Sequence, residues 1–175
     1  MRRAVVLTAS DGVSAGVRED ASGAAVEARL TDLGYAVDRV LVTDDMGEIS
    51  TALATGSGDH DLIITTGGTG LTPRDVTPQA TRAVIDYEVP GLAESMRAAG
   101  RAITPLADLS RAVVGVRGRT LIVNLPGSPK GALESLAALE PVLEHALETL
   151  AGPFDHGADE GAGGGAGGDA GGDAG

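Results

Sequence analysis

The sequence predicts an α/β protein with three layers, in which a mostly parallel, doubly wound sheet carries helices on both faces. Two observations support this prediction. Apolar, strand-like runs alternate with helix-like patterns along the chain, and this order is typical of a parallel sheet with crossover helices. The first run, residues 4–9, is apolar except for one threonine, as expected of a strand buried on both faces.

The alternation continues through the first half of the chain. A helix with Ser22 as its capping residue is expected after the first strand. Residues 36–42 and 61–66 are predicted to be the second and third strands. Between these two strands, the spacing of Ile49 and Leu53 indicates a second helix.

The third strand is followed by two helical patterns. The first is predicted over residues 77–87, with Thr77 as its N-cap. Pro78 then takes the first helical position, where proline is tolerated. Residues 92–99 have the pattern of a shorter helix.

The last part of the predicted fold contains two strands and one long helix. The strands are expected at residues 112–116 and 120–125, on either side of a turn-like Arg-Gly-Arg. The helix is expected at residues 131–150. Pro141 lies inside it and is expected to break or kink it, because proline removes a backbone donor.

Composition excludes several classes of function. A formal net charge of −12 argues against nucleic acid and against an anionic membrane surface as a general partner. Without cysteine, disulfides, thiolate catalysis and zinc–thiolate sites are excluded. No run approaches the roughly 20 apolar residues of a membrane span, and the N-terminal apolar run is interrupted too early for a signal peptide. We therefore expect a cytoplasmic protein.

The chain is expected to form one folded domain over residues 1–156. Residues 157–175 consist only of glycine, alanine, aspartate and glutamate. Such a segment cannot bury apolar surface, so a flexible acidic tail is predicted there.

A glycine-rich segment follows the third strand and is the most informative part of the sequence. Gly67, Gly68, Thr69 and Gly70 offer backbone N–H groups and a hydroxyl that can surround an anion. Asp75 follows closely, where a bound phosphate needs a divalent cation. An ordinary strand-to-helix turn is the simpler alternative for this segment on its own.

Three more polar clusters follow predicted strands, at residues 8–16, 43–45 and 124–131. If these strands are parallel, all four clusters meet at the carboxyl edge of the sheet, where open α/β sheets bind their ligands. Four such clusters at one edge predict a binding site for phosphate chemistry.

Carboxylates in these clusters suggest a magnesium site. Asp44 and Asp75 carry the hard oxygen ligands that Mg²⁺ prefers, and Mg²⁺ also retains waters and substrate phosphates. Asp45 is the alternative to Asp44, although it is equally suited to cap the next helix.

Cations in the same clusters have two possible roles. Lys130 and Arg74 are able to neutralise phosphate charge, although Arg74 is equally interpretable as a surface cation. Ser128 either binds phosphate or shapes its proline-rich turn. No Ser–His–Asp set appears at recognisable positions, so covalent catalysis is not favoured.

These motifs together resemble the MogA/MoaB family of molybdenum cofactor biosynthesis, which includes molybdopterin adenylyltransferases and the G domain of gephyrin. The resemblance runs from about residue 5 to 152. It rests on Ser10-Asp11 with Val13-Ser14-Ala15-Gly16, Asp20 with Ser22-Gly23, Gly67-Gly68-Thr69-Gly70, Pro73-Arg74-Asp75-Val76-Thr77-Pro78, Pro90-Gly91, Leu109-Ser110-Arg111 and Leu125-Pro126-Gly127-Ser128-Pro129-Lys130.

The resemblance implies a molybdopterin-binding fold, commonly trimeric, that transfers AMP from Mg-ATP to the terminal phosphate of molybdopterin and releases pyrophosphate. It implies two essential aspartates, Asp44 and Asp75, and delivery of the product to a molybdate-inserting partner. The substrate- and phosphate-binding set expected on these grounds is Ser10, Asp11, Ser14, Gly67, Gly68, Thr69, Gly70, Arg74, Ser110, Pro126, Gly127, Ser128 and Lys130.

Two alternatives remain open. One is a non-catalytic pterin-binding or scaffold protein of the MoaB type, against which the presence of Asp44 and Asp75 argues. The other is an enzyme that shares the fold but acts on other substrates, as in the CinA proteins or the molybdate-insertion enzymes. Those proteins carry extra domains, for which 175 residues leave no room.

Overall fold

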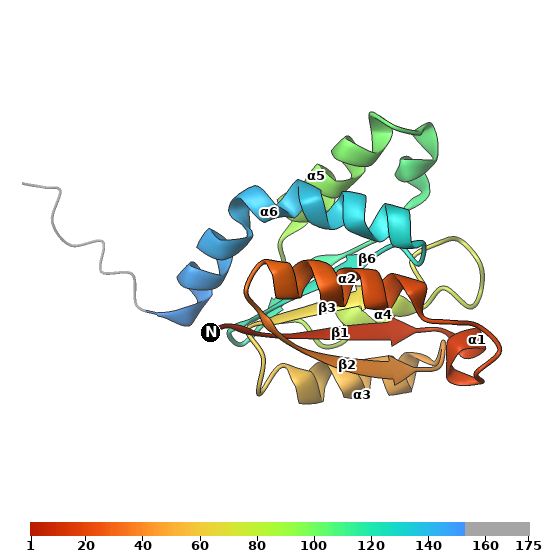
Figure 1. The fold of residues 1–175 in the computed structure, drawn as a ribbon, viewed down its shortest axis with the longest axis horizontal. Coiled ribbons are helices and arrows are strands. Elements are labelled where there is room, and N and C mark those ends of the chain that lie inside the picture. The colour runs from red at the N-terminus through yellow and green to blue at the C-terminus, as the bar shows by residue number, and fades with distance from the viewer. Residues whose placement is uncertain (153–175) are drawn as a thin grey trace, which may run out of the picture.

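A computed structural model describes residues 1–152 of the chain. Its centre is one six-stranded sheet with the strand order β2-β1-β3-β6-β5-β4 (Figure 1). The strands are β1 (Arg3–Ala9), β2 (Ala36–Val42), β3 (Leu62–Thr66), β4 (Tyr87–Glu88), β5 (Val114–Arg117) and β6 (Thr120–Leu125).

Four neighbouring strands run in the same direction. β1 is parallel to both β2 and β3, and β3 is parallel to β6, whereas β5 and β4 complete the sheet in antiparallel pairing. The register places Thr8 of β1 beside Thr66 of β3, and Thr66 beside Leu125 of β6. The mostly parallel sheet predicted from the sequence is therefore confirmed, and the polar clusters that follow these strands share one edge.

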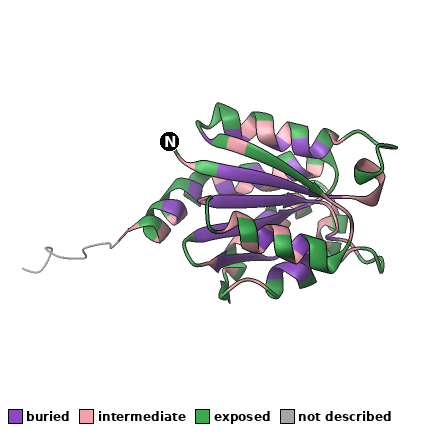
Figure 2. Ribbon diagram, turned by 90° about the horizontal axis from the view of Figure 1, so that it is seen from below, coloured by how far each residue is buried: buried purple, intermediate pink, exposed green. Residues whose placement is uncertain are grey.

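Helices cover both faces of the sheet, so the fold has three layers (Figure 1). One core lies under α2 (Ala21–Asp32), α5 (Pro90–Arg101) and α6 (Pro129–Ala151), where Leu30, Met96 and Leu139 are buried against the strands. The second core lies on the opposite face, under α3 (Met46–Gly56) and α4 (Thr77–Arg82). Figure 2 shows buried strands in the middle of the sheet, between helices whose outer sides are exposed, whereas the edge strand β2 is largely exposed.

The prediction of a helix over residues 77–87 is wrong for the C-terminal half of that range. α4 ends at Arg82, and Tyr87–Glu88 instead forms β4, which pairs with β5. The backbone N–H of Asp86 donates to the carbonyl of Val116 at 2.7 Å, so the chain joins the sheet at this point. A pairing across about 30 residues of sequence has replaced a local helical preference.

Helix starts also differ from the predictions. Val76 is the N-cap of α4, and Thr77 lies inside the helix, fully buried. Asp20 caps α2 by accepting from the N–H of Gly23 at 2.9 Å, and Ser22 is the second helical residue. In these two helices the cap lies one or two residues earlier than predicted.

Pro141 does not break the last helix. α6 runs as one element from Pro129 to Ala151 with Pro141 inside it, and Figure 1 shows its axis bending along its length. Besides β4, two further short elements were not predicted: α1 (Asp11–Ser14) and the 3₁₀ helix η1 (Pro105–Leu109). Within residues 1–152, none of the helices has the length and apolarity needed to cross a membrane. The predicted tail, residues 157–175, lies outside the described residues.

Candidate active site at the carboxyl edge of the sheet

The site lies where the chain reverses its order across the sheet. From β1 the connection through α2 leads outward to β2, whereas β3 returns to the other side of β1. The loops after β1 and β3 therefore diverge and leave a crevice, as at the ligand sites of other open α/β sheets. The loops after β2 and β6 flank this crevice because all four strands are parallel.

A cavity of about 470 Å³ occupies this crevice, and we call it the aspartate cavity. Both candidate metal ligands line it, as do residues from each of the four predicted clusters. The predicted site residues among its lining are Ser10, Asp44, Gly67, Gly68, Arg74, Asp75 and Gly127. Four segments far apart in the sequence are thus brought together as predicted.

Asp44 and Asp11 are joined by two reciprocal hydrogen bonds, each from the main-chain N–H of one residue to the carboxylate of the other. The N–H of Asp11 donates to Oδ2 of Asp44, and the N–H of Asp44 donates to Oδ1 of Asp11, each at 3.0 Å. Arg74 closes the cluster by pairing with Oδ2 of Asp11. The Asp44 N–H, and next to it the Arg74 guanidinium, hold the pKa of Asp11 below its ordinary value. These hydrogen bonds join the loops after β1 and β2, and the Arg74–Asp11 ion pair connects the glycine-rich segment to them.

Asp45 caps a helix, which was the alternative to its role as a metal ligand. It is the N-cap of α3 and accepts from the N–H of Glu48 at 2.9 Å. Glu48 in turn accepts from the hydroxyl of Thr43 at 2.7 Å. Asp44 is therefore the member of the pair that lines the cavity.

Asp75 is fixed by its own loop. Its Oδ2 accepts from the N–H of Thr72 at 2.8 Å and from the hydroxyl of Thr72 at 2.6 Å. Partial burial raises the pKa of Asp75, but the Thr72 hydrogen bonds, a Gly70 N–H and the charge of Arg111 together outweigh this effect and lower the pKa. The carboxylate is thus held ionised, as a cation ligand must be.

Residues 67–70 of the glycine-rich segment, which we call the glycine loop, need glycine at two positions. Gly67 and Gly68 have φ angles of +94° and +66°, a region that side chains with a Cβ rarely adopt. A Cβ on Gly67 would also lie 2.6 Å from the carbonyl oxygen of Ala9. Gly127, in the loop after β6, approaches so closely that its Cβ would lie 3.3 Å from Cα of Gly67. The two loops are packed backbone against backbone beside the cavity.

A second cavity of about 340 Å³ adjoins the first on the other side of the glycine loop, and we call it the helix cavity. Its walls come from α5, η1 and the start of α6, and include Met96 and Leu106. Five further predicted residues line it: Thr69, Gly70, Ser110, Pro126 and Ser128. The glycine loop and the turn after β6 thus contribute to both cavities.

Three predicted residues lie outside the linings of both cavities among residues 1–152. Asp11 is engaged by Arg74 and Asp44 at the rim. Ser14 is exposed at the end of α1. Lys130 has a side chain that is 80% exposed, and its Nζ lies 3.8 Å from Oε1 of Glu134. Glu134 lines the helix cavity, so Lys130 lies beside that cavity without lining it, and its phosphate-binding role stays a prediction.

Sequence reasoning missed a chain of hydroxyls beneath the aspartate cavity. Ser22 donates to Thr66 at 3.3 Å, Thr66 donates to Thr8 at 3.2 Å, and Thr8 donates to Asp20 at 2.9 Å. Asp20 also pairs with Arg39. The signals in the sequence were a threonine near the end of each of two apolar strands and the motif of Asp20 with Ser22-Gly23.

Asn124 was also missed as a structural centre. It is fully buried, its amide donates to the hydroxyls of Thr65 at 3.1 Å and Thr81 at 2.9 Å, and its Oδ1 accepts from the N–H of Val113 at 3.2 Å. The three partners lie in β3, in α4 and just before β5, so this side chain fixes the end of β6 beside the helix cavity.

The donor set fits a hard divalent cation bound together with a phosphate ligand. Asp44 and Asp75 face one cavity from different loops, and Asp44 commits Oδ2 to the N–H of Asp11 while Oδ1 carries no hydrogen bond within residues 1–152. No group of three or more potential metal-binding side chains is present in that part of the chain. Mg²⁺ commonly takes one or two carboxylates and completes its shell with waters and substrate phosphates, which matches a pair of aspartates beside a loop that presents backbone N–H groups.

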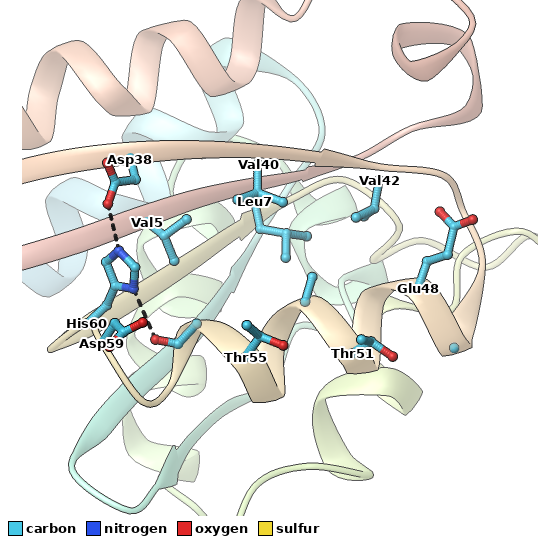
Figure 3. Close-up of a pocket in the computed structure, with 13 residues that line it drawn as sticks. Val5, Leu7, Asp38, Val40, Val42, Glu48, Thr51, Thr55, Asp59 and His60 are labelled. Atoms are coloured by element: carbon cyan, nitrogen blue, oxygen red, sulfur yellow. Dashed lines mark hydrogen bonds and ion pairs between the residues drawn. The ribbon is translucent and has the colours of Figure 1, made fainter.

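A third cavity, about 710 Å³, lies between β2 and α3 (Figure 3). It is lined by the strand side chains Val5, Leu7 and Val40, and at one end by His60, which binds Asp38 at 2.9 Å. None of the predicted site residues lines this cavity in the described part of the chain.

Fold and site together define a class: a doubly wound α/β protein in which a glycine-rich loop and two aspartates meet at the switch point of the sheet. Residues 5–145 match the family model described as the probable molybdopterin binding domain. The chain therefore belongs to the molybdopterin-binding domain family.

Individual relatives agree with this assignment. A Helicobacter pylori J99 protein named molybdopterin adenylyltransferase is 38% identical over 156 residues, which cover 85% of this chain and 88% of the relative. The crystal structure of the MoaB protein of Thermus thermophilus is 52% identical, with a TM-score of 0.81 over 86% of this chain and 96% of that one. The Mog protein of Mycobacterium ulcerans is 42% identical, with a TM-score of 0.82 over 86% of this chain and 100% of that one.

Proposed function

We propose that this protein is a molybdopterin adenylyltransferase of molybdenum cofactor biosynthesis, which transfers AMP from Mg-ATP to the terminal phosphate of molybdopterin and releases pyrophosphate. The observation that carries the proposal is the pair of adjoining cavities separated by one glycine loop, with Asp44 and Asp75 in one of them. A transfer between two bound molecules needs two neighbouring pockets that meet at the reacting atoms. The name of the H. pylori relative supports the choice of reaction.

Each cavity suits one part of the reaction. The aspartate cavity takes the phosphates of ATP, because backbone N–H groups of the glycine loop can donate to phosphate oxygens there. The helix cavity takes the pterin, because apolar walls such as Met96 and Leu106 flank polar groups such as Ser110 and Glu134. Flat heterocycles with polar edges are bound by pockets of this kind.

The reaction balances without a protein nucleophile. An oxygen of the terminal phosphate of molybdopterin attacks the α-phosphorus of ATP, a new P–O–P bond forms, and the bond to the β-phosphate oxygen breaks as pyrophosphate leaves. Both reactants are anions, so positioning and charge neutralisation dominate catalysis. Asp44 and Asp75 would hold Mg²⁺, which when bound neutralises phosphate charge. The glycine loop keeps the α-phosphate between the cavities.

The test is turnover of molybdopterin and ATP with Mg²⁺ by matched aspartate variants. Asp44→Asn and Asp75→Asn are each expected to lower kcat by about 10²–10³-fold, the size of losing one charge-stabilising contact. Asp45→Asn is the control, because asparagine also caps helices well and Asp45 caps α3. Wild-type turnover by a folded Asp75→Asn protein would remove Asp75 from the mechanism, and a larger loss in Asp45→Asn would reverse the assignment of Asp44.

A non-catalytic pterin-binding protein is the second candidate, since the structural relatives include a MoaB protein. It predicts molybdopterin binding without release of pyrophosphate. Measuring both quantities on the same preparation separates the two candidates.

We also propose a homotrimer in the cytoplasm that passes its product to a molybdate-insertion enzyme. This proposal rests on the family resemblance. Light scattering that gives a monomer at all concentrations would overturn the trimer.

A further inference from the structure

Arg111 binds across the segment that carries Asp75. Its Nε donates to the carbonyl oxygen of Gly70 at 2.7 Å, and its Nη2 donates to the carbonyl oxygen of Asp75. Its Nη1 donates to Oε1 of Gln79 at 3.2 Å, on α4. The backbone N–H of Arg111 adds a bond to the carbonyl of Thr69 at 3.0 Å. One residue thus ties down both ends of residues 69–75.

Arg111 connects the two cavities. Its neighbours Ser110 and Ala112 both line the helix cavity, whereas Asp75, which its guanidinium holds, lines the aspartate cavity. Arg97 on α5 supports the segment around Arg111 from behind, because its Nη1 donates to the carbonyl of Ala112 at 3.2 Å. The position of Asp75 is therefore fixed relative to the wall of the helix cavity.

Only arginine can make this set of contacts. The guanidinium presents its donors in a rigid planar fork, and here three different nitrogens of Arg111 reach three acceptors. A lysine ammonium is a compact charge on a flexible stem, so it cannot span the carbonyls of Gly70 and Asp75 in the same way. Two of the contacts go to main-chain oxygens, so they fix the path of the loop itself.

We propose that Arg111 is a positioning residue, which holds residues 69–75 (the Asp75 loop) in their binding geometry beside the wall of the helix cavity. The catalytic consequence rests on the proposed adenylyltransferase function. A misplacement of about 1 Å in a reactive site can cost on the order of 10²-fold in rate. Loss of the arginine contacts therefore acts on catalysis while the folded core stays intact.

The matched control is Arg117, which lies at the end of strand β5 and lines neither of the two cavities. Its Nη1 donates to the carbonyl of Val84 at 2.7 Å, so it also binds a main-chain oxygen through a guanidinium. Arg111→Lys and Arg117→Lys both keep the charge and most of the side-chain stem. Only the first is expected to disturb the Asp75 loop.

The first measurement is hydrogen exchange on the full chain without ligands. Peptides that cover residues 69–75 should exchange about tenfold faster in Arg111→Lys than in the wild type, because two anchoring bonds at that loop are lost. The same peptides should be unchanged in Arg117→Lys. Unchanged exchange in Arg111→Lys overturns the proposal, and this result does not depend on any activity.

The second measurement is steady-state adenylylation with molybdopterin, ATP and varied Mg²⁺. Arg111→Lys should lower kcat by about 10- to 100-fold and raise the Mg²⁺ concentration needed for half-maximal rate, with a melting temperature close to that of Arg117→Lys. An effect confined to the KM for molybdopterin, or a rate loss no larger than the loss of folded protein, overturns the positioning role. Absence of turnover in the wild type would sink the proposed function alone, since the exchange result stands independently.

Discussion

Replacing Gly68 with alanine probes how tightly the glycine loop is packed. Gly68 has a φ of +66°, and a Cβ built on it would overlap Oγ1 of Thr77 and lie 3.2 Å from Cβ of Thr77. Thr77 is fully buried in α4, so it has little room to move away. The substitution therefore combines a strained backbone with a steric overlap.

A second glycine allows the two costs to be separated. Gly16 has a nearly equal φ of +70°, but a Cβ there meets nothing within 4 Å. A side chain in this left-handed region costs roughly 1–2 kcal/mol, which both variants share. Overpacking adds about 1–3 kcal/mol, and only Gly68→Ala incurs this part. We therefore expect the free energy of unfolding of Gly68→Ala to be lower than that of Gly16→Ala by the overpacking cost. This corresponds to a melting temperature lower by about 2–12 °C.

Thr77→Ala provides an internal test of the steric part. Among residues 1–152, Oγ1 of Thr77 is a buried polar atom without a hydrogen-bond partner, so removing it leaves no other group unsatisfied. The double variant Gly68→Ala/Thr77→Ala should recover part of the stability that Gly68→Ala loses, with a coupling free energy of about 1–2 kcal/mol.

The assay is thermal and urea unfolding of the wild type, the three single variants and the double variant at equal protein concentration. A Gly68→Ala protein as stable as Gly16→Ala would refute the overlap, and strictly additive changes in the double variant would place the cost elsewhere than at Thr77. The same variants can be assayed for ATP binding, because the overlap displaces the loop that lines the aspartate cavity.

Three further outcomes are expected. Although partial burial raises the pKa of Asp75, the Thr72 hydrogen bonds help to hold it low, so Thr72→Val should move the acid limb of the pH–rate profile to higher pH. Hydrogen bonds from Arg29 lower the pKa of Glu140, so their stabilisation is complete above its ordinary value of 4.5 and is lost as pH falls through the folded value. Glu140→Gln should accordingly lower the melting temperature at pH 7 by about 2 °C, and this difference should vanish in acid. Truncation after His156 should leave melting temperature and turnover nearly unchanged, and a tenfold change in turnover would contradict an independent tail.

The sheet could be predicted from the sequence because several of its strands are apolar runs that are recognisable locally. Residues 4–9 and 120–125 are apolar runs that need no partner to be recognised, and both are strands in the structure. β4 could not be found in this way, since Tyr87–Glu88 is too short for a pattern and exists only through its pairing with β5. The end of α4 is set by the same distant pairing.

The gathering of the site could be predicted, but its internal contacts could not. Parallel strand order is enough to bring Asp44 and Asp75 to one edge. The pairing of Arg74 with Asp11, and of Arg111 with the Asp75 loop, depends on side-chain directions across about 40 to 60 residues of sequence. Such contacts have no periodicity, and in a single sequence nothing marks them.

Charge explains why loop geometry matters so much in this protein. The chain carries a formal charge of −12, so its long-range field repels ATP and phosphate. Three cations near the site are paired, Arg74 with Asp11, Arg39 with Asp20 and Lys130 with Glu134. Arg18, which lines the aspartate cavity, forms no ion pair within residues 1–152. Under the proposed function, attraction for an anion comes from Arg18 together with groups that act at short range, the N–H groups of the glycine loop and a cation on the two aspartates. Interactions of this kind weaken steeply with misplacement, so residues that touch no substrate, such as Arg111 and Thr77, control the site by controlling where the loop lies.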